Sequence, residues 1–166
     1  MKIGVYPGTF DPITNGHIDL IERSLRIFDK VIVAVAPNPR KSPLFDLTER
    51  LEMIKEGVNN LKNVEIGAFD SLLVDYIKRQ GAIAIIRGLR AVSDFEFEFQ
   101  MALMNRKLDS TIETVFLVPS EKYSYLTSSI VKEVSSYCGD IRDLVPSVVI
   151  KRIEKKNKEK RDETNR

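Results

Sequence analysis

Short runs of apolar and β-branched residues alternate along the chain with longer segments in which apolar positions recur every three or four residues. Near-continuous apolar runs are typical of strands buried on both faces of a sheet. Five of them predict strands at 2–6, 30–36, 64–69, 82–86 and 114–118. The periodic segments predict helices at 17–28, 47–58, 71–80, 93–108, 128–138 and 141 to about 160. This alternation indicates an α/β fold, a Rossmann-like open five-stranded parallel sheet with helices on both faces and a C-terminal helix.

Capping residues refine the helix boundaries. The first helix is expected to begin around Gly16, and Asp46 is placed to cap the second. Ser71 should cap the third helix, which should stop at Gly81 because glycine tolerates the left-handed conformation there. Pro146 should lie near the first turns of the last helix, where a missing N–H is tolerated.

The composition fits one packed domain. Hydrophobic residues make up 43% of the 166 residues and charged residues 30%, so disorder is not expected. We predict a single domain over 1–150, followed by the helix end and a charged tail over 151–166. One cysteine, Cys138, excludes an intrachain disulfide and a cysteine metal cluster. No apolar stretch reaches bilayer length and no secretory signal opens the chain, so we expect a cytoplasmic protein without membrane contact.

The charge is unevenly distributed. Eight Lys or Arg and four Asp or Glu lie between residues 151 and 166, which leaves residues 1–150 with a net charge of −2. A body of this charge is not a basic nucleic-acid binder, so we expect no nucleic-acid partner for it. The tail is interpreted as a solvated helix end, with contact to RNA or an acidic partner as the alternative.

The loop after the first strand carries the clearest chemical signal. Residues 6–17 read YPGTFDPITNGH, with prolines that stiffen the loop and glycines that permit close approach. His17, the only histidine, falls in the first turn of the next helix, where unpaired N–H groups favour an anion. The helix N-terminus lowers a histidine pKa and a bound polyphosphate raises it, so its charge state is left open. The loop matches neither a Walker P-loop nor a dinucleotide-binding glycine motif.

Further cations and hydroxyls follow other predicted strands. Arg40 and Lys41 come after the second strand, and Arg87 and Arg90 after the fourth. Residues 127–129, Thr-Ser-Ser, begin the helix after the fifth strand. Since ligands of parallel sheets bind beyond the carboxyl ends of the strands, we expect these groups and His17 to converge on one polyphosphate. The alternatives are solvated surface cations and an ordinary helix cap, with Ser128 as the cap.

The motifs resemble a known family. Thr14-Asn15-Gly16-His17 is similar to the [H/T]-x-G-H signature of the nucleotidyltransferase superfamily, and YPGTFDPITNGH is similar to bacterial phosphopantetheine adenylyltransferases. Residues 86–91 (IRGLRA), 94–96 (DFE) and 127–133 (TSSIVKE) resemble that family's later motifs. The resemblance extends from residue 3 to about 147. Thr14 stands where the superfamily often has histidine, and Thr127 where serine is usual.

The resemblance implies an enzyme that transfers the adenylyl group of ATP to 4′-phosphopantetheine, giving dephospho-coenzyme A and pyrophosphate. The acceptor phosphate attacks in line without a covalent enzyme intermediate, so catalysis rests on alignment and charge stabilisation. Mg²⁺ would be carried by ATP, and no protein metal site is expected. The resemblance also implies a homohexamer and coenzyme A as a feedback ligand.

Individual roles are likewise implied by the resemblance. The catalytic residues would be His17 as transition-state stabiliser, Lys41 and Arg90. The acceptor would be bound by Thr9, Lys41, Leu73 and Arg87. ATP would be bound by Thr9, Phe10, His17, Gly88, Leu89, Arg90, Glu98, Tyr123, Ser124, Tyr125, Leu126, Thr127, Ser128 and Ser129. Lys132, one turn after the hydroxyl-rich motif, could add charge or face solvent.

Two alternatives stay open on the sequence. One is a related transferase with another acceptor, either nicotinamide mononucleotide or a phosphorylated alcohol that receives a cytidylyl group. The other is a non-catalytic nucleotide-binding or RNA-associated module that works through its basic tail. The match at residues 86–91 and 94–96 favours the pantetheine enzyme.

Overall fold

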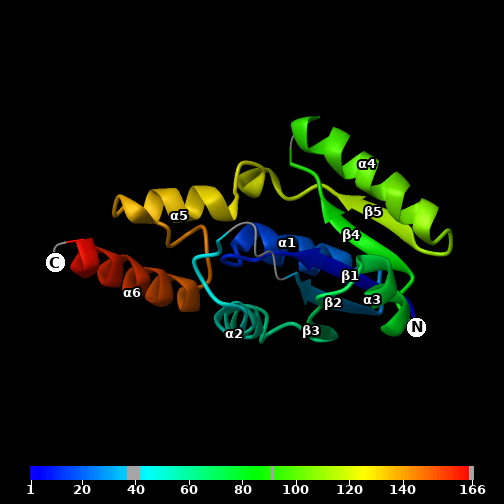
Figure 1. The fold of residues 1–166 in the computed structure, drawn as a ribbon, viewed down its shortest axis with the longest axis horizontal. Coiled ribbons are helices and arrows are strands. Elements are labelled where there is room, and N and C mark those ends of the chain that lie inside the picture. The colour runs from blue at the N-terminus through cyan, green and yellow to red at the C-terminus, as the bar shows by residue number, and fades with distance from the viewer. Residues whose placement is uncertain (37–41, 91, 165–166) are drawn as a thin grey trace.

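One parallel sheet organises the chain (Figure 1). The computed structural model describes residues 1–36, 42–90 and 92–164. Within them the strands are β1 (Ile3–Gly8), β2 (Lys30–Val35), β3 (Val64–Ala68), β4 (Ala84–Gly88) and β5 (Glu113–Leu117). Their order in the sheet is β3-β2-β1-β4-β5, and every pair of neighbours is parallel. The predicted five-stranded α/β architecture is confirmed.

The order of the strands reverses between β1 and β4. The chain first builds outward from β1 through β2 to β3, and then crosses back to place β4 against the other side of β1. Val5 of β1 is in register with Ile85 of β4. Connections that leave two adjacent strands in opposite directions open a crevice beyond their carboxyl ends. This point of the sheet is therefore where a ligand site is expected.

Helices cover both faces of the sheet, as Figure 1 shows. Residues of β2 alternate between two cores: Val31, Val33 and Val35 face one, and Ile32 and Ala34 face the other. This alternation explains the continuous apolar run, because both faces of a central strand are covered. The helices are α1 (Asn15–Ser24), α2 (Leu47–Gly57), α3 (Leu73–Arg79), α4 (Val92–Leu108), α5 (Ser128–Ser136) and α6 (Ser147–Thr164), with a short 3₁₀ helix, η2 (Glu121–Tyr123).

Several helix boundaries differ from the prediction, most clearly the end of α1 and the start of α6. Helix α1 ends at Ser24, and a tight turn continues the chain so that Phe28 still packs in the core. The predicted helix was therefore too long, because Phe28 continues the apolar spacing of α1 although it lies beyond the helix end. Helix α6 begins only after Pro146, because a proline disfavours helical geometry in the residue before it. The segment 141–145 instead packs Ile141 and Val145 into the core without forming a helix.

The third helix also starts differently. Ser71 does not cap it; the N-cap position is Leu72, without a side-chain cap, and the Ser71 hydroxyl accepts a hydrogen bond from Arg79 at 2.6 Å. The expected stop is present, since Gly81 follows the helix with a φ of 62°. The predicted cap at Asp46 is confirmed, because its carboxylate accepts from the Glu49 N–H at 2.8 Å.

Helix α6 is bound to the body along its first half. Val149 and Ile153 are buried in the core shared with α2 and α5. Arg152 pairs with Glu52 of α2 at 2.8 Å, and Lys156 lies 3.1 Å from Glu49. Part of the tail's positive charge is therefore neutralised within the fold. In the described part of the chain, no helix has the length and apolar character needed to cross a bilayer.

Candidate active site

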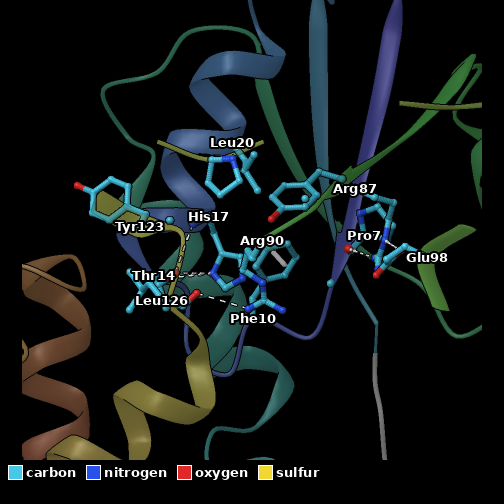
Figure 2. A pocket seen from close by; sticks show the side chains of 15 residues that line it. Pro7, Phe10, Thr14, His17, Leu20, Arg87, Arg90, Glu98, Tyr123 and Leu126 are labelled. Carbon is cyan, nitrogen blue, oxygen red and sulfur yellow. Dashed lines mark hydrogen bonds and ion pairs between the residues drawn. The ribbon is translucent and has the colours of Figure 1, made fainter. Parts of the chain in front are cut away.

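A cavity of about 150 Å³ opens at the carboxyl ends of β1 and β4, where the strand order reverses (Figure 2). Its walls come from β1, the loop that follows it, the start of α1, the end of β4, and the segment around η2. Among the predicted site residues, eight line it: Phe10, His17, Arg87, Gly88, Arg90, Glu98, Tyr123 and Leu126. The cavity therefore brings together predicted site residues that are up to 116 positions apart in the sequence, from Phe10 to Leu126.

The N-terminus of α1 forms one wall. Thr14 is the N-cap and adopts an extended backbone, and its hydroxyl accepts from the His17 N–H at 3.3 Å. In return, the His17 side chain reaches back, with Nδ1 3.0 Å from the Thr14 backbone nitrogen. This reciprocal capping box places the imidazole at the first turn of the helix, facing the cavity. His17 thus occupies the N3 position of the capping box, where glutamate or glutamine is usual.

The surroundings of His17 disfavour its charged form. Phe10 packs against the imidazole edge-on at 5.1 Å between ring centroids, and Tyr6 lies 6.3 Å away. Burial, followed by the charge of Arg90, lowers the pKa of His17 from its ordinary 6.5 to about 4. In the absence of a ligand the imidazole is therefore neutral at pH 7.

The loop after β1 is folded closely around Phe10. This residue has a φ of 49°, and its side chain is buried against Tyr6 and His17. A Cβ at Gly8 would lie 2.9 Å from the Phe10 ring, so the loop requires glycine at this position. Thr9, between them, is outside the cavity lining, and its carbonyl accepts from Arg50 at 2.9 Å.

Arg87 is held in place by three acceptors. Both carboxylate oxygens of Glu98 accept from its guanidinium, one at 2.7 Å, and the Pro7 carbonyl accepts from Nη1 at 3.0 Å. Burial opposes the charge of Arg87, but the bond and attraction to Glu98 outweigh it and raise its pKa. Arg87 lies within β4 rather than after it, because the strand extends to Gly88. Glu98, expected at ATP, here fixes the orientation of an arginine.

Arg90 closes another side of the cavity. Its Nη1 lies 3.4 Å from the Leu126 carbonyl oxygen, which links the β4–α4 connection to the segment before α5. Gly88 lines the cavity between the two arginines, and a Cβ there would meet the Leu20 side chain at 2.4 Å. Leu89 is outside the lining, and its N–H donates to the Leu117 carbonyl at 2.9 Å.

The hydroxyl-rich motif at α5 lies beside the cavity rather than in its lining. Thr127, not Ser128, is the N-cap of α5, and it accepts from the Ile130 N–H at 3.0 Å. The Ser128 hydroxyl instead donates to the Pro12 carbonyl at 2.7 Å, which ties α5 to the first loop. The predicted ATP contacts outside the lining are Thr9, Leu89, Ser124, Tyr125, Thr127, Ser128 and Ser129.

The predicted acceptor residue Leu73 lies outside this cavity. Leu73 lines a neighbouring cavity of about 110 Å³, whose wall also includes Arg87 and Glu98. The Arg87–Glu98 pair therefore separates this second cavity from the first. Lys41 and Arg40 fall outside the described residues.

The structure reveals a buried carboxylate that the sequence did not single out. Asp11 is 4% exposed and accepts from the Leu44 and Phe45 N–H groups, each at 3.0 Å. Lys132 of α5 reaches the same carboxylate at 2.6 Å, so it neither faces solvent freely nor stands as a separate charge. Asp11 thus joins the first loop, the start of α2 and α5 around one side of the site. No sequence pattern distinguishes such an acid from an exposed one.

Arg50 has a comparable structural role. It is 3% exposed, and it donates to the carbonyls of Thr9 and Ala36 at 2.9 and 3.3 Å. The sequence pattern did indicate that Arg50 is buried, since this residue occupies the same face of α2 as the buried Met53 and Ile54. A charged residue at an apolar position of a helix indicates a buried cation with carbonyl or carboxylate partners.

The acidic residues near the cavity are already paired. Glu98 is bound to Arg87, and Asp11 to Lys132 and two amides. Across residues 1–36, 42–90 and 92–164, no three His, Cys, Asp or Glu side chains gather as a metal site. The arrangement as a whole offers donors and positive charge to an anion, from one imidazole and two guanidinium groups.

Known proteins resemble this chain in sequence and structure. The profile of the cytidylyltransferase-like family matches residues 5–134. A phosphopantetheine adenylyltransferase from Geotalea daltonii is 59% identical over 94% of this chain and 97% of that protein. Another, from Alkaliphilus metalliredigens, is 54% identical over 95% of this chain and 100% of that protein. A solved structure of a candidate nicotinate-nucleotide adenylyltransferase from Vibrio parahaemolyticus has a TM-score of 0.70 at 19% identity, covering 95% of each chain, which shows the fold alone.

These similarities agree with the motifs read from the sequence. The family profile spans the sheet, the cavity and the start of α5. The two relatives match this chain over nearly its whole length and over nearly their own. The chain belongs to the phosphopantetheine adenylyltransferase family, within the cytidylyltransferase-like nucleotidyltransferases.

Proposed function

We propose that this chain transfers the adenylyl group of ATP to 4′-phosphopantetheine, giving dephospho-coenzyme A and pyrophosphate, in the cytoplasm. The observation that carries the proposal is the convergence of His17, Arg87 and Arg90 on one cavity at the strand-order reversal. Family membership supports the acceptor, since the relatives are named for phosphopantetheine.

The side chains suit a direct displacement at the α-phosphorus. The attacking oxygen of the acceptor phosphate forms the new P–O bond as the bond to pyrophosphate breaks. Negative charge on the α-phosphoryl oxygens is best stabilised by preorganised donors, and His17 and Arg90, which both line the cavity, would supply them. Arg87, fixed by Glu98, would hold the acceptor phosphate, with Lys41 as the second cation.

Mg²⁺ would enter with ATP, bound to the triphosphate and to water. It would neutralise charge on the leaving pyrophosphate. The cavity lining is consistent with a metal ion held by ATP rather than by the protein, because its acidic side chain, Glu98, is bound to Arg87. Coenzyme A contains the product of the reaction, so we propose that it competes for the same site.

A homohexamer is the proposed assembly, and the surface of α4 supports an interface between copies. This helix exposes large apolar side chains on more than one of its sides, which a monomer would leave in water: Phe95, Phe97, Phe99, Met101, Leu103, Met104 and Leu108. An exposed apolar surface of this kind marks an association site. Light scattering tests it, since Phe97→Glu together with Met104→Glu should yield smaller particles than the unaltered chain.

Pyrophosphate release tests the proposed reaction. With ATP and Mg²⁺, release should require 4′-phosphopantetheine and should be at least about tenfold slower with nicotinamide mononucleotide. Replacing ATP by CTP with a phosphorylated alcohol tests the cytidylyl alternative. Faster turnover in either comparison would overturn the assignment of the acceptor. Release without any acceptor would indicate hydrolysis and would overturn the transfer reaction itself.

A further inference from the structure

The imidazole of His17 makes two contacts through the same ring nitrogen. Nδ1 lies 3.0 Å from the backbone nitrogen of Thr14 and 3.0 Å from the Thr14 hydroxyl oxygen. That hydroxyl oxygen also accepts from the His17 backbone N–H at 3.3 Å. Figure 2 shows Thr14 beside the imidazole, at the edge of the cavity.

The chemistry of these groups selects one protonation state. A backbone N–H can only donate, so Nδ1 must accept and can carry no proton. The Thr14 hydroxyl can turn its hydrogen toward Nδ1 while its oxygen accepts from the His17 N–H, so every group is satisfied. In the Nδ1–H tautomer, and in the imidazolium, two N–H groups would oppose each other across 3.0 Å. The neutral form with its proton on Nε2 is the only one compatible with the contacts.

We propose that Thr14 is a positioning residue, which locks His17 as the neutral Nε2–H tautomer so that the ring presents one hydrogen-bond donor to the cavity. In the described part of the chain, no protein group accepts from or donates to Nε2, so this donor is available to a ligand. Its target would be a phosphoryl oxygen, a point that rests on the proposed function. The tautomer itself rests on Thr14 alone.

The groups that face His17 from the surrounding elements are consistent with a neutral ring. Tyr6 of β1 and Phe10 of the first loop present aromatic rings, and burial keeps Tyr6 neutral by raising its pKa. Arg90, from the connection after β4, opposes a second positive charge. The carboxylate of Glu98, on α4, is neutralised by Arg87. The lowered pKa of His17 agrees with the geometry.

A neutral donor has a consequence for catalysis. The imidazole needs no proton uptake before it stabilises a developing negative charge. It keeps one orientation because rotation about χ1 or χ2 would break the contacts to Thr14. The helix cap and the catalytic donor are therefore the same structural unit. A loss of the Thr14 hydroxyl should act on turnover more than on binding.

Nitrogen-15 NMR tests the tautomer directly, because His17 is the only histidine and its ring gives one set of signals. In the uniformly labelled full chain without ligands, Nε2 should show the shift of a protonated ring nitrogen and Nδ1 that of a bare one. Both shifts should stay constant from pH 8 to about 5.5. Averaged shifts, a proton on Nδ1, or titration near pH 6.5 would overturn the proposal.

Substitutions separate positioning from stability. In Thr14→Val, the backbone N–H of residue 14 still donates to Nδ1, so the ring shifts should remain those of the Nε2–H tautomer, while the ring loses its contact with the hydroxyl. The kcat for pyrophosphate release should fall about tenfold, with KM for ATP changed less than about threefold. Thr14→Ser, which keeps the hydroxyl, should restore kcat. A proton on Nδ1 in Thr14→Val, or a loss confined to KM, would contradict the positioning role.

Asp46→Ala is the matched control for helix capping. It removes the equivalent capping box of α2, whose side chains do not contact His17. It should lower the free energy of unfolding by about 1 kcal/mol, as for a lost N-cap, and leave the histidine shifts unchanged. The NMR readout also separates two failures. If transfer activity is absent but the Nε2–H signal is present, the proposed function fails and the locked tautomer stands.

Discussion

Arg87 of β4 and Glu98 of α4 form a bidentate ion pair that separates the active-site cavity from a second cavity beside Leu73. The guanidinium cannot turn freely, since the Pro7 carbonyl holds its third nitrogen at 3.0 Å. A cation fixed in this way loses little entropy when it binds a phosphate. Under the proposed function, Glu98 would therefore act on the acceptor through Arg87.

Removal of this carboxylate should weaken acceptor binding. In Glu98→Gln, the amide can accept only one of the two bonds from Arg87, so KM for 4′-phosphopantetheine should rise about tenfold. The KM for ATP should change less. Initial rates with each substrate varied in turn measure the two constants, and an increase confined to ATP would place Glu98 at the nucleotide instead. Glu96→Gln, on the exposed side of α4, is the control.

Loss of the imidazole should slow the chemical step. We expect His17→Ala to reduce kcat by about 10²–10³, the scale for losing one preorganised oxyanion donor. His17→Gln should restore the capping box, because glutamine is favoured at this helix position, but not the full rate. Single-turnover measurements with saturating ATP provide the comparison. A kcat within threefold of the unaltered enzyme would rule out the assigned role.

Acid should destabilise the fold through His17. The folded protein holds this pKa at about 4, whereas the unfolded chain titrates near 6.5. Between these values the unfolded state binds the extra proton, so the stabilising contribution is complete above pH 6.5 and is lost as the pH falls toward 4. The difference in free energy of unfolding between the native chain and His17→Gln should change by up to about 3 kcal/mol across this window. Urea titrations at successive pH values measure it, and a pH-independent difference would contradict the lowered pKa.

The Asp11–Lys132 pair should show energetic coupling. Asp11→Ala leaves the Lys132 ammonium and the Leu44 and Phe45 amides without their acceptor, so it should cost about 2–4 kcal/mol of stability. Lys132→Met leaves Asp11 with its two amide donors and should cost less. Denaturant unfolding of both single variants and the double variant gives the interaction free energy. Strictly additive losses would show that the two residues do not interact.

The basic tail should be dispensable for the reaction. A chain ending at Asn157 keeps the buried Ile153 and the pairs of Arg152 and Lys156 with α2, so it should fold and should retain kcat within about twofold. The rate of pyrophosphate release gives kcat for the full chain and for the shortened chain. If the shortened chain is folded by circular dichroism yet inactive, the tail contributes to function, as the RNA-associated alternative requires.

The amino-acid sequence by itself determined the architecture and the family. Five mostly apolar runs and six periodic segments are local patterns, and the central strands β1 and β2 show the burial on both faces that such a run predicts, whereas β3 is partly exposed. The motif around His17 is also local, because the cap and the histidine lie on the same helical turn. These features can be read without knowing which strands are neighbours.

The tertiary structure alone decided which side chains share the site. Arg87 pairs with Glu98, and Asp11 pairs with Lys132, because the fold brings separate segments together. Thr127 rather than Ser128 caps α5, because the residue with the extended backbone at the helix start is Thr127. The strand order that brings β4 against β1 is not encoded in any local pattern. Pairing, burial and protonation depend on three-dimensional neighbours, so the lowered pKa of His17 follows only from its burial and from Arg90 beside it in the folded chain.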